Sequence, residues 1–113
     1  MTINTTIRGM ELTEAISAYV IDKMSTLEKY EDQLRHLDVE MGKNTQHHQK
    51  GEVFFCKVAA QVQGDIVRIE KDEEDLYKAI DKVRDHLRME LTERKQRIRE
   101  RAHGHVKAAE EQG

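Results

Sequence analysis

Hydrophobic and polar residues alternate in four segments of the chain, a pattern typical of strands with one buried face. The predicted strands are Thr2–Arg8, Leu37–Met41, Val53–Val62 and Ile66–Lys71. The second and third are separated by a polar segment bounded by glycines, Gly42–Gly51, which we expect to be a loop. The third and fourth are separated by the residues Gln63-Gly64-Asp65, which predict a tight hairpin turn.

Apolar residues recur at helical spacing in two other segments. The first predicted helix runs from about Glu14 to Tyr30, with Thr13 as its N-cap. The second begins near Asp75, after the acidic run 72–75 that would favour a helix N-terminus, and continues to about Ala102. A helix of this length spans about 40 Å, which is longer than a small core can cover. Its last turns should therefore project into solvent or onto a partner.

These elements follow one another in the order β-α-β-β-β-α, which predicts an α+β fold. A four-stranded sheet with one apolar face needs cover on that face, and two amphipathic helices can supply it. The other face of the sheet is predicted to be wet, with exposed Asp38, Glu40, Lys57 and Arg68. We expect residues 1–102 to form one domain and residues 103–113 to form a short flexible tail.

Composition limits the classes to which the protein can belong. A chain of 113 residues is the size of one domain, and a single cysteine cannot form an intrachain disulfide. No segment has the roughly 20 apolar residues of a membrane span, and Met1–Arg8 lacks the apolar core of a signal peptide. A cytoplasmic protein that does not enter the membrane is the best fit.

The formal net charge of −3 hides an uneven distribution. Residues 1–75 carry 9 basic and 15 acidic side chains, whereas residues 76–107 carry 10 basic and 5 acidic ones. The last six residues add two acidic side chains, Glu110 and Glu111. A basic helix on an acidic body favours contact with a polyanion through one face of the protein.

A helical wheel of the second helix places four cations in one row. With Arg84 at zero, Arg88, Lys95 and Arg99 fall at about 40°, about 20° and about 60°, beside the apolar stripe. We call these four residues the cation stripe. The acidic residues of the helix lie on another sector, apart from Asp81. Arginine suits phosphate because its planar guanidinium donates two parallel hydrogen bonds.

Where the apolar stripe ends, the helix carries three further arginines, Arg94, Arg97 and Arg101. Tyr77 lies on the same side of the wheel as the cation stripe and is a candidate for stacking on a base. On the first helix, the basic side chains of Lys23 and Lys29 are candidates to extend this surface.

A structural interpretation of the same residues stays open. The helix can be a solvated one laced with ion pairs, such as Glu90 with Arg94 and Glu93 with Arg97. Tyr77 can serve only to shield the edge between helix and sheet, and each lysine of the first helix can be simply solvated. These pairs would account for only two of the cations, and the cation stripe and Arg101 would remain mostly uncompensated.

Catalytic and metal chemistry find little support in the sequence. The histidine pairs at 47–48 and 103/105, with one cysteine, do not supply the four spaced ligands of structural zinc. Cys56 lies in the middle of a predicted strand, as a small core residue would. There is no Ser-His-Asp pattern in a strand-turn-helix context and no glycine-rich phosphate loop. We therefore expect no enzyme activity, no cofactor and no bound metal.

Several short motifs resemble the ribosome hibernation promoting factor family, whose members include the ribosome-associated inhibitor (protein Y) and proteins described as sigma-54 modulation proteins. The strongest is Glu74-Asp75-Leu76-Tyr77-x-Ala79-Ile80-Asp81, which leads into Asp85, Leu87 and Leu91-Thr92. The N-terminal part adds Ile3-x-x-x-Ile7, Glu11-Leu12-Thr13-Glu14-Ala15, Lys23 and Leu27-Glu28-Lys29-Tyr30. The resemblance covers about Met1 to Arg101.

The resemblance implies the same β-α-β-β-β-α fold, similar in arrangement to the double-stranded RNA-binding domain. It also implies binding to the small ribosomal subunit and its rRNA, in the channel that otherwise holds mRNA and tRNA, and inhibition of translation in stress or stationary phase. The length matches a short family member or a piece of a long one. Whether it pairs ribosomes or only inactivates single ones, and whether it self-associates, stays open.

The resemblance carries over to single residues only in part. Lys23, Tyr77 and Asp75 match family positions, as do Lys95, Arg97 and Arg99.

Where the family often has Arg-Gln this chain has Met89-Glu90, and where it often has Lys this chain has Glu93. The neighbouring Arg88 and Arg94 can compensate, but a shift of one residue rotates each cation by about 100° around the helix.

The leading hypothesis is thus a ribosome-binding inhibitor. The alternatives are a general RNA-binding module without a ribosomal role and a protein-interaction domain that uses the long C-terminal helix. A membrane and a small-molecule substrate are not expected as partners. The candidate RNA- and ribosome-binding residues are Lys23, Lys29, Tyr77, Arg84, Arg88, Arg94, Lys95, Arg97, Arg99 and Arg101.

Overall fold

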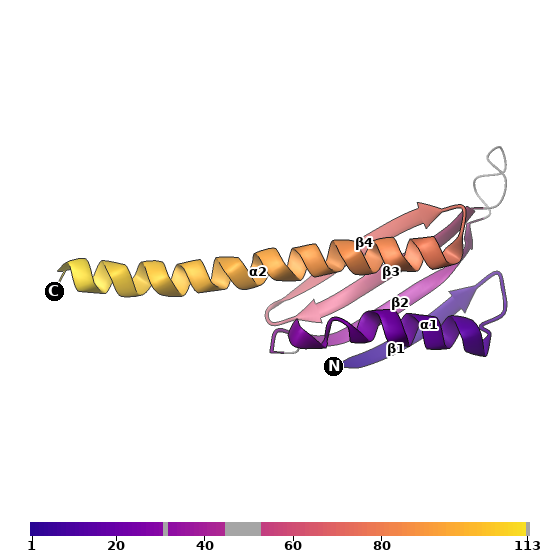
Figure 1. The fold of residues 1–113 in the computed structure, drawn as a ribbon, viewed down its shortest axis with the longest axis horizontal. Coiled ribbons are helices and arrows are strands. Elements are labelled where there is room, and N and C mark those ends of the chain that lie inside the picture. The colour runs from indigo at the N-terminus through magenta and orange to yellow at the C-terminus, as the bar shows by residue number, and fades with distance from the viewer. Residues whose placement is uncertain (31, 45–52, 113) are drawn as a thin grey trace.

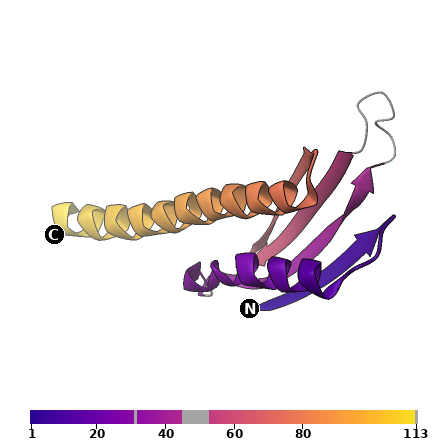
Figure 2. The same cartoon turned by 45° about the vertical axis from the view of Figure 1, so that its right-hand side comes forward.

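The computed structural model describes residues 1–30, 32–44 and 53–112, with side chains up to Arg101, and it shows a sheet covered on one face by two helices (Figures 1 and 2). The strands are β1 (Thr2–Arg8), β2 (Leu34–Asn44), β3 (Val53–Val62) and β4 (Asp65–Glu73). The helices are α1 (Glu14–Ser25), the short 3-10 helix η1 (Glu28–Tyr30) and α2 (Leu76–Gln112). The predicted α+β fold and the order β-α-β-β-β-α are confirmed.

The strands lie in the order β1-β2-β3-β4. β1 is parallel to β2, to which α1 connects it, and the two remaining pairs are antiparallel. Gly64 turns the chain between β3 and β4 with a φ of 81°, a conformation that glycine adopts without strain. α1 packs against β1 and α2 against β3 and β4, so the two helices lie next to each other over the same face.

The predicted bounds of β1 and β3 agree with the structure, but β2 is longer than predicted. Its first residue, Leu34, pairs with Val62, and a bulge follows before His36. Its last residue, Asn44, pairs with Val53. β2 therefore extends beyond its alternating segment at both ends, because the long neighbouring strand β3 supplies hydrogen-bond partners there. Residues 42–44, which we expected in a loop, belong to β2, and the rest of that predicted loop lies outside the described residues.

The acidic run before α2 is divided between two elements. Asp72 and Glu73 continue β4, where they pair with Phe55 and Phe54 of β3, so β4 is longer than the predicted Ile66–Lys71, while the predicted helix start near Asp75 is confirmed. Asp75 alone acts as the cap, because its carboxylate accepts a hydrogen bond from the backbone N–H of Tyr77 at 2.8 Å.

The first helix ends earlier than the predicted Tyr30. The hydroxyl of Thr26 donates to the carbonyl oxygen of Lys23 at 2.6 Å, and the N–H of Leu27 donates to the carbonyl of Met24 at 3.0 Å. These contacts tighten the chain from α-helical to 3-10 geometry, as serine and threonine side chains near helix ends often do. The Thr13 cap at the other end is confirmed, since its hydroxyl accepts from the N–H of Ile16 at 3.2 Å.

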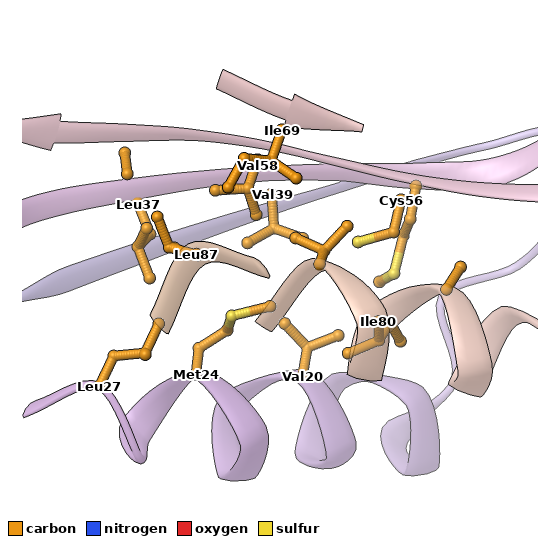
Figure 3. Packing of buried hydrophobic residues seen from close by; sticks show 14 of the residues in the cluster. Val20, Met24, Leu27, Leu37, Val39, Cys56, Val58, Ile69, Ile80 and Leu87 are labelled. Atoms are coloured by element: carbon orange, nitrogen blue, oxygen red, sulfur yellow. The ribbon is translucent and has the colours of Figure 1, made fainter. Parts of the chain in front are cut away.

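The hydrophobic core lies between the sheet and the two helices (Figure 3). α1 contributes Val20 and Met24, and α2 contributes Ile80 and Leu87, all fully buried. They meet the apolar face of the central strands, whose buried residues include Leu37, Val39, Met41, Cys56, Val58 and Ala60. The outer face of the sheet exposes Asp38, Lys57 and Arg68, as predicted, while Glu40 is half-buried.

Only the first part of α2 is covered by this core. Leu91 is its last buried residue among those whose side chains are described. The helix nevertheless continues to Gln112, so its predicted end at Ala102 was wrong. Gly104 does not interrupt it, since a single glycine inside a helix costs only about 1 kcal/mol. The uncovered part extends about 30 Å beyond Leu91 and gives the molecule its length of 64 Å (Figure 1). The flexibility of residues 103–113 stays a prediction.

Candidate nucleic-acid interface

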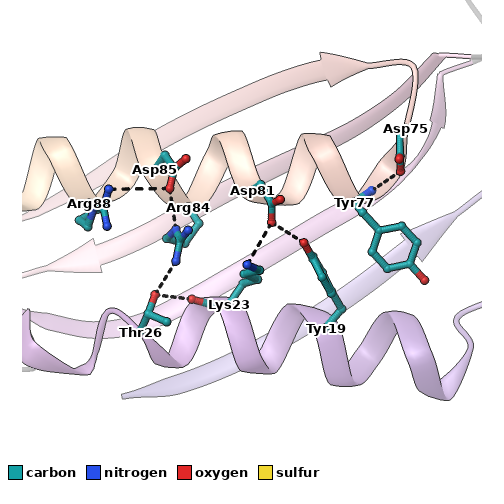
Figure 4. Close-up of polar contacts among 9 residues, drawn as sticks. All are labelled: Tyr19, Lys23, Thr26, Asp75, Tyr77, Asp81, Arg84, Asp85 and Arg88. Atoms are coloured by element: carbon teal, nitrogen blue, oxygen red, sulfur yellow. Dashed lines mark hydrogen bonds and ion pairs between the residues drawn. The ribbon is translucent and has the colours of Figure 1, made fainter.

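The exposed edge between α1 and α2 carries a network of polar contacts centred on Asp81 (Figure 4). The hydroxyl of Tyr19 donates to the Asp81 carboxylate at 2.6 Å, and the ammonium of Lys23 lies 3.8 Å from the same oxygen. The rings of Tyr19 and Tyr77 meet edge to face, 4.7 Å apart. Tyr77 is therefore both part of the seam between the helices and, at 38 % exposure, accessible from outside.

The hydrogen bond to Asp81 changes the acidity of Tyr19. Together with partial burial, it raises the pKa of the phenol to about 12 from the ordinary value of 10.0. Ionisation of the phenol would remove the donated proton and place two negative charges next to each other.

The high pKa of Tyr19 predicts that stability falls at alkaline pH. The folded protein holds this proton more tightly than the unfolded chain, so the contribution is complete below about pH 10 and lost as the pH rises towards about 12. A spectroscopic titration of the tyrosines should therefore show one late phenol, absent in Tyr19→Phe. In Asp81→Asn its pKa should return towards the ordinary value. An unchanged titration in Asp81→Asn would contradict this assignment.

Arg84 was expected to be uncompensated, and the structure corrects this. Its guanidinium donates to Asp85 at 2.8 Å and to the hydroxyl of Thr26 at 3.1 Å, and only 16 % of the side chain is exposed. Arg84 thus links α2 to the C-terminal end of α1. Arg88 lies 4.0 Å from the same Asp85 oxygen but keeps 49 % of its side chain exposed. Asp85, placed on a separate sector by the wheel, in fact partly neutralises the cation stripe.

Further along the edge between α1 and α2, two lysines from different elements lie over one aromatic ring. The ammonium of Lys29 lies 5.3 Å from the ring centroid of Tyr30, and that of Lys95 lies 6.0 Å from it. The hydroxyl of Tyr30 is 2.5 Å from that of Thr92 in α2. Lys29, an isolated candidate in the sequence, is therefore next to the cation stripe in space.

Beyond this point, α2 presents exposed cations. Arg97, Arg99 and Arg101 are all exposed, and none forms an ion pair with another residue whose side chain is described. The exposed apolar residues Met89 and Ile98 lie on the same helix. The predicted pair of Glu93 with Arg97 is not formed, and the ion-pair partner of Glu90 is His86 at 3.8 Å rather than Arg94.

Arg94 points to a different place from the other candidate cations. Its guanidinium donates to the carbonyl oxygen of Gln63 at 3.0 Å and lies 3.5 Å from the carboxylate of Asp65. It therefore holds the turn between β3 and β4 against α2, with 23 % of its side chain exposed.

We predict that Arg94→Ala mainly affects stability. Loss of the two contacts to the turn should lower the free energy of unfolding by about 1 kcal/mol, because both are partly screened by solvent. Binding to RNA or ribosomes should stay within about twofold of wild type, since the side chain is already occupied. Urea denaturation and a binding assay on the same variant check this. A large binding loss at unchanged stability would show that Arg94 contacts the ligand directly.

Cys56 and the histidines were the residues considered for catalytic and metal chemistry. Cys56 is fully buried, and burial raises the pKa of its thiol to about 12, as suits a core residue. Among the residues whose side chains are described, no three His, Cys, Asp or Glu come together as a metal ion would require. The histidines at 47, 48, 103 and 105 lie outside that set. No helix in the described part of the chain is long and apolar enough to cross a membrane.

Sequence reasoning missed four residues that shape this surface: Tyr19, Thr26, Tyr30 and Asp85. Tyr19 was not among the candidates, because nothing in the sequence indicates that it faces Asp81 of the other helix. Tyr30 was expected at the end of a helix, where nothing indicated that a ring would meet Lys95.

Comparisons with known proteins agree with this architecture. The family model described as sigma 54 modulation protein / S30EA ribosomal protein matches residues 3–99. A curated ribosome hibernation promotion factor from Deinococcus radiodurans is 35 % identical over 94 residues. The match covers 80 % of this chain and 47 % of that relative, so the chain spans about half the relative's length.

Two solved structures share the fold. The N-terminal domain of Thermus thermophilus protein Y is 30 % identical, with a TM-score of 0.65, over 80 % of this chain and 96 % of that domain. A ribosomal subunit interface protein from Coxiella burnetii gives a TM-score of 0.73 over 85 % of this chain and 99 % of that one. At 17 % identity the latter supports the fold alone. The family match spans most of the chain, and the chain belongs to the sigma 54 modulation protein / S30EA ribosomal protein family, as its motifs indicated.

Proposed function

We propose that this protein binds the small ribosomal subunit through the face formed by α1, η1 and α2. It would lie in the channel that otherwise holds mRNA and tRNA and would inhibit translation by occupying it. The name of a curated relative, a ribosome hibernation promotion factor, and the family description as an S30EA ribosomal protein support a ribosome-associated role.

The observation that carries the proposal is the convergence of cations from separate elements on one face. Lys23 and Lys29 come from the N-terminal half of the chain, and Arg88 and Lys95 come from α2. RNA phosphates attract such a surface without requiring a pocket, because each contact releases counterions from the nucleic acid. Contacts to phosphates position a protein but carry no sequence information, so little reading of bases is expected.

The shape of the molecule agrees with a steric mechanism. Its extents of 64 × 29 × 18 Å describe a narrow body with a long helix along one side. A rigid body of this kind acts by excluding other ligands from the space that it occupies. Inhibition then needs neither a catalytic group nor a cofactor.

Sedimentation with purified small subunits tests this function. The protein should co-sediment at low salt, release steeply as salt rises, and resist competition by excess duplex RNA. It should also reduce initiation with a leaderless mRNA and initiator tRNA in proportion to occupancy. If duplex RNA removes the protein as readily as small subunits bind it, the protein is a general RNA-binding module. If it binds neither, the exposed Ile98 of α2 would favour a protein partner instead.

A further inference from the structure

The ring of Tyr30 brings together two cations that are far apart in the sequence. Lys29 precedes it in η1, while Lys95 belongs to α2. Their ammonium groups lie 5.3 and 6.0 Å from the same ring centroid, so the distance between them is no more than those two distances together. An aromatic face attracts a cation electrostatically, which offsets part of the repulsion between the two lysines.

Tyr30 is fixed in place from several directions. Only 5 % of the residue is exposed, and its hydroxyl is bonded to Thr92 of α2 at 2.5 Å. Close by, the buried side chain of Gln33 donates to the carbonyl oxygen of Leu91 at 3.4 Å. The ring is thus held against α2 at the point where that helix leaves the core. A ring held in this way can act as a platform for both lysines.

Neither lysine is neutralised within the described part of the protein. Lys29 and Lys95 form no ion pair with any acidic residue whose side chain is described, although Lys23 and Arg88 do. Two ammonium groups on the same ring, with no carboxylate paired to either, repel each other, and an anion bound by both would relieve the repulsion. A phosphate fits such a site because it accepts hydrogen bonds from both ammonium groups.

We propose that Tyr30 is a positioning residue that holds Lys29 and Lys95 as a joint site for a single backbone phosphate of RNA. This proposal rests on the function proposed above, and it identifies the place on that surface where one phosphate is bound by two lysines. The exposed Arg88 and Arg99 lie on the same stripe of α2, before and after Lys95. An extended RNA backbone can reach all of them, whereas a small free anion would engage only the pair.

A double-mutant cycle on the two lysines tests the joint site. The dissociation constant for small subunits is measured for wild type, Lys29→Ala, Lys95→Ala and the double variant. Each single substitution should weaken binding by about ten- to a hundredfold, and the double variant should be little weaker than the singles, because one phosphate contact is lost in each case. The dependence of binding on salt should flatten by the equivalent of about one phosphate contact in all three variants.

Substitutions of the ring complete the test. Tyr30→Phe keeps the ring and should bind within about twofold of wild type, whereas Tyr30→Leu should lose affinity and also the coupling between the two lysines. The lysine cycle does not disturb the core, so the result stands even if Tyr30→Leu does not fold.

Two results would overturn the joint site, and only one of them would also overturn the proposed function. If wild type binds small subunits but the two lysine losses multiply, the joint site is wrong and the proposed function survives. If wild type does not bind small subunits at all, both fail.

Discussion

Changing Arg88, Lys95 and Arg99 to glutamate is expected to abolish binding to small subunits. Hydrogen bonds to charged groups contribute about 1.5–3 kcal/mol each, so losing three of them should weaken binding by at least about a thousandfold. The introduced carboxylates would then repel phosphates, which adds to the loss. Arg88 and Arg99 are exposed, Lys95 is partly exposed, and all three lie outside the core, so the variant should fold normally. Sucrose-gradient profiles with and without the triple change measure the effect.

A matched control distinguishes the effect of where the charges lie from the effect of the net charge on binding. Arg35, Lys57 and Arg68 are exposed residues of the sheet, and changing all three to glutamate alters the net charge by the same amount. If α1 and α2 form the interface, this control should retain most of its binding at moderate salt, and its thermal unfolding should show that it is folded. Equal losses in both triple variants would mean that net charge, not the helical face, decides binding.

The fold was predictable because each strand and helix repeats its apolar residues at the spacing that burial of one face requires. β3 has apolar residues at every second position along its whole length, and its predicted ends agree with the structure. The ends that were wrong depend on partners distant in sequence. Leu34 and Asn44 belong to β2 only because β3 pairs with them, and α1 stops at Ser25 because Thr26 captures a helix carbonyl.

The candidate site was predictable in outline for a similar reason. A helical wheel contains the angular order of side chains on α2, so the row of cations follows from the sequence. It does not contain what faces that row from other elements. Thr26, the C-cap of α1, accepts a hydrogen bond from Arg84, and the β3–β4 turn binds Arg94, so two of the candidate cations are occupied within the protein. The contact of both Lys29 and Lys95 with the ring of Tyr30 was missed because η1 ends next to α2 only in three dimensions.

Gly42 of β2 lies opposite the end of the edge strand β1, and substitution there should be the most destabilising single change that we predict. Gly42 pairs with Arg8, and a β-carbon added to it would lie 1.9 Å from the backbone oxygen of Arg8. Its φ of 152° also lies in a region that other residues rarely adopt. Backbone on the opposing strand cannot give way as a flexible side chain would, so β1 itself would have to move.

Gly42→Ala is therefore expected to lower the free energy of unfolding by about 2–4 kcal/mol, measured by urea denaturation. Gly64→Ala is the matched control, because its φ is also positive but nothing lies within 4 Å of an added β-carbon. It should cost only about 1 kcal/mol of backbone strain. Equal losses in the two variants would show that backbone conformation, not the approach of β1, makes glycine necessary at position 42. Because only the short connection 9–13 separates β1 from α1, a shift of β1 should also displace Lys23 and Thr26 from α2. Binding to small subunits should then weaken in Gly42→Ala even under conditions in which the protein remains folded.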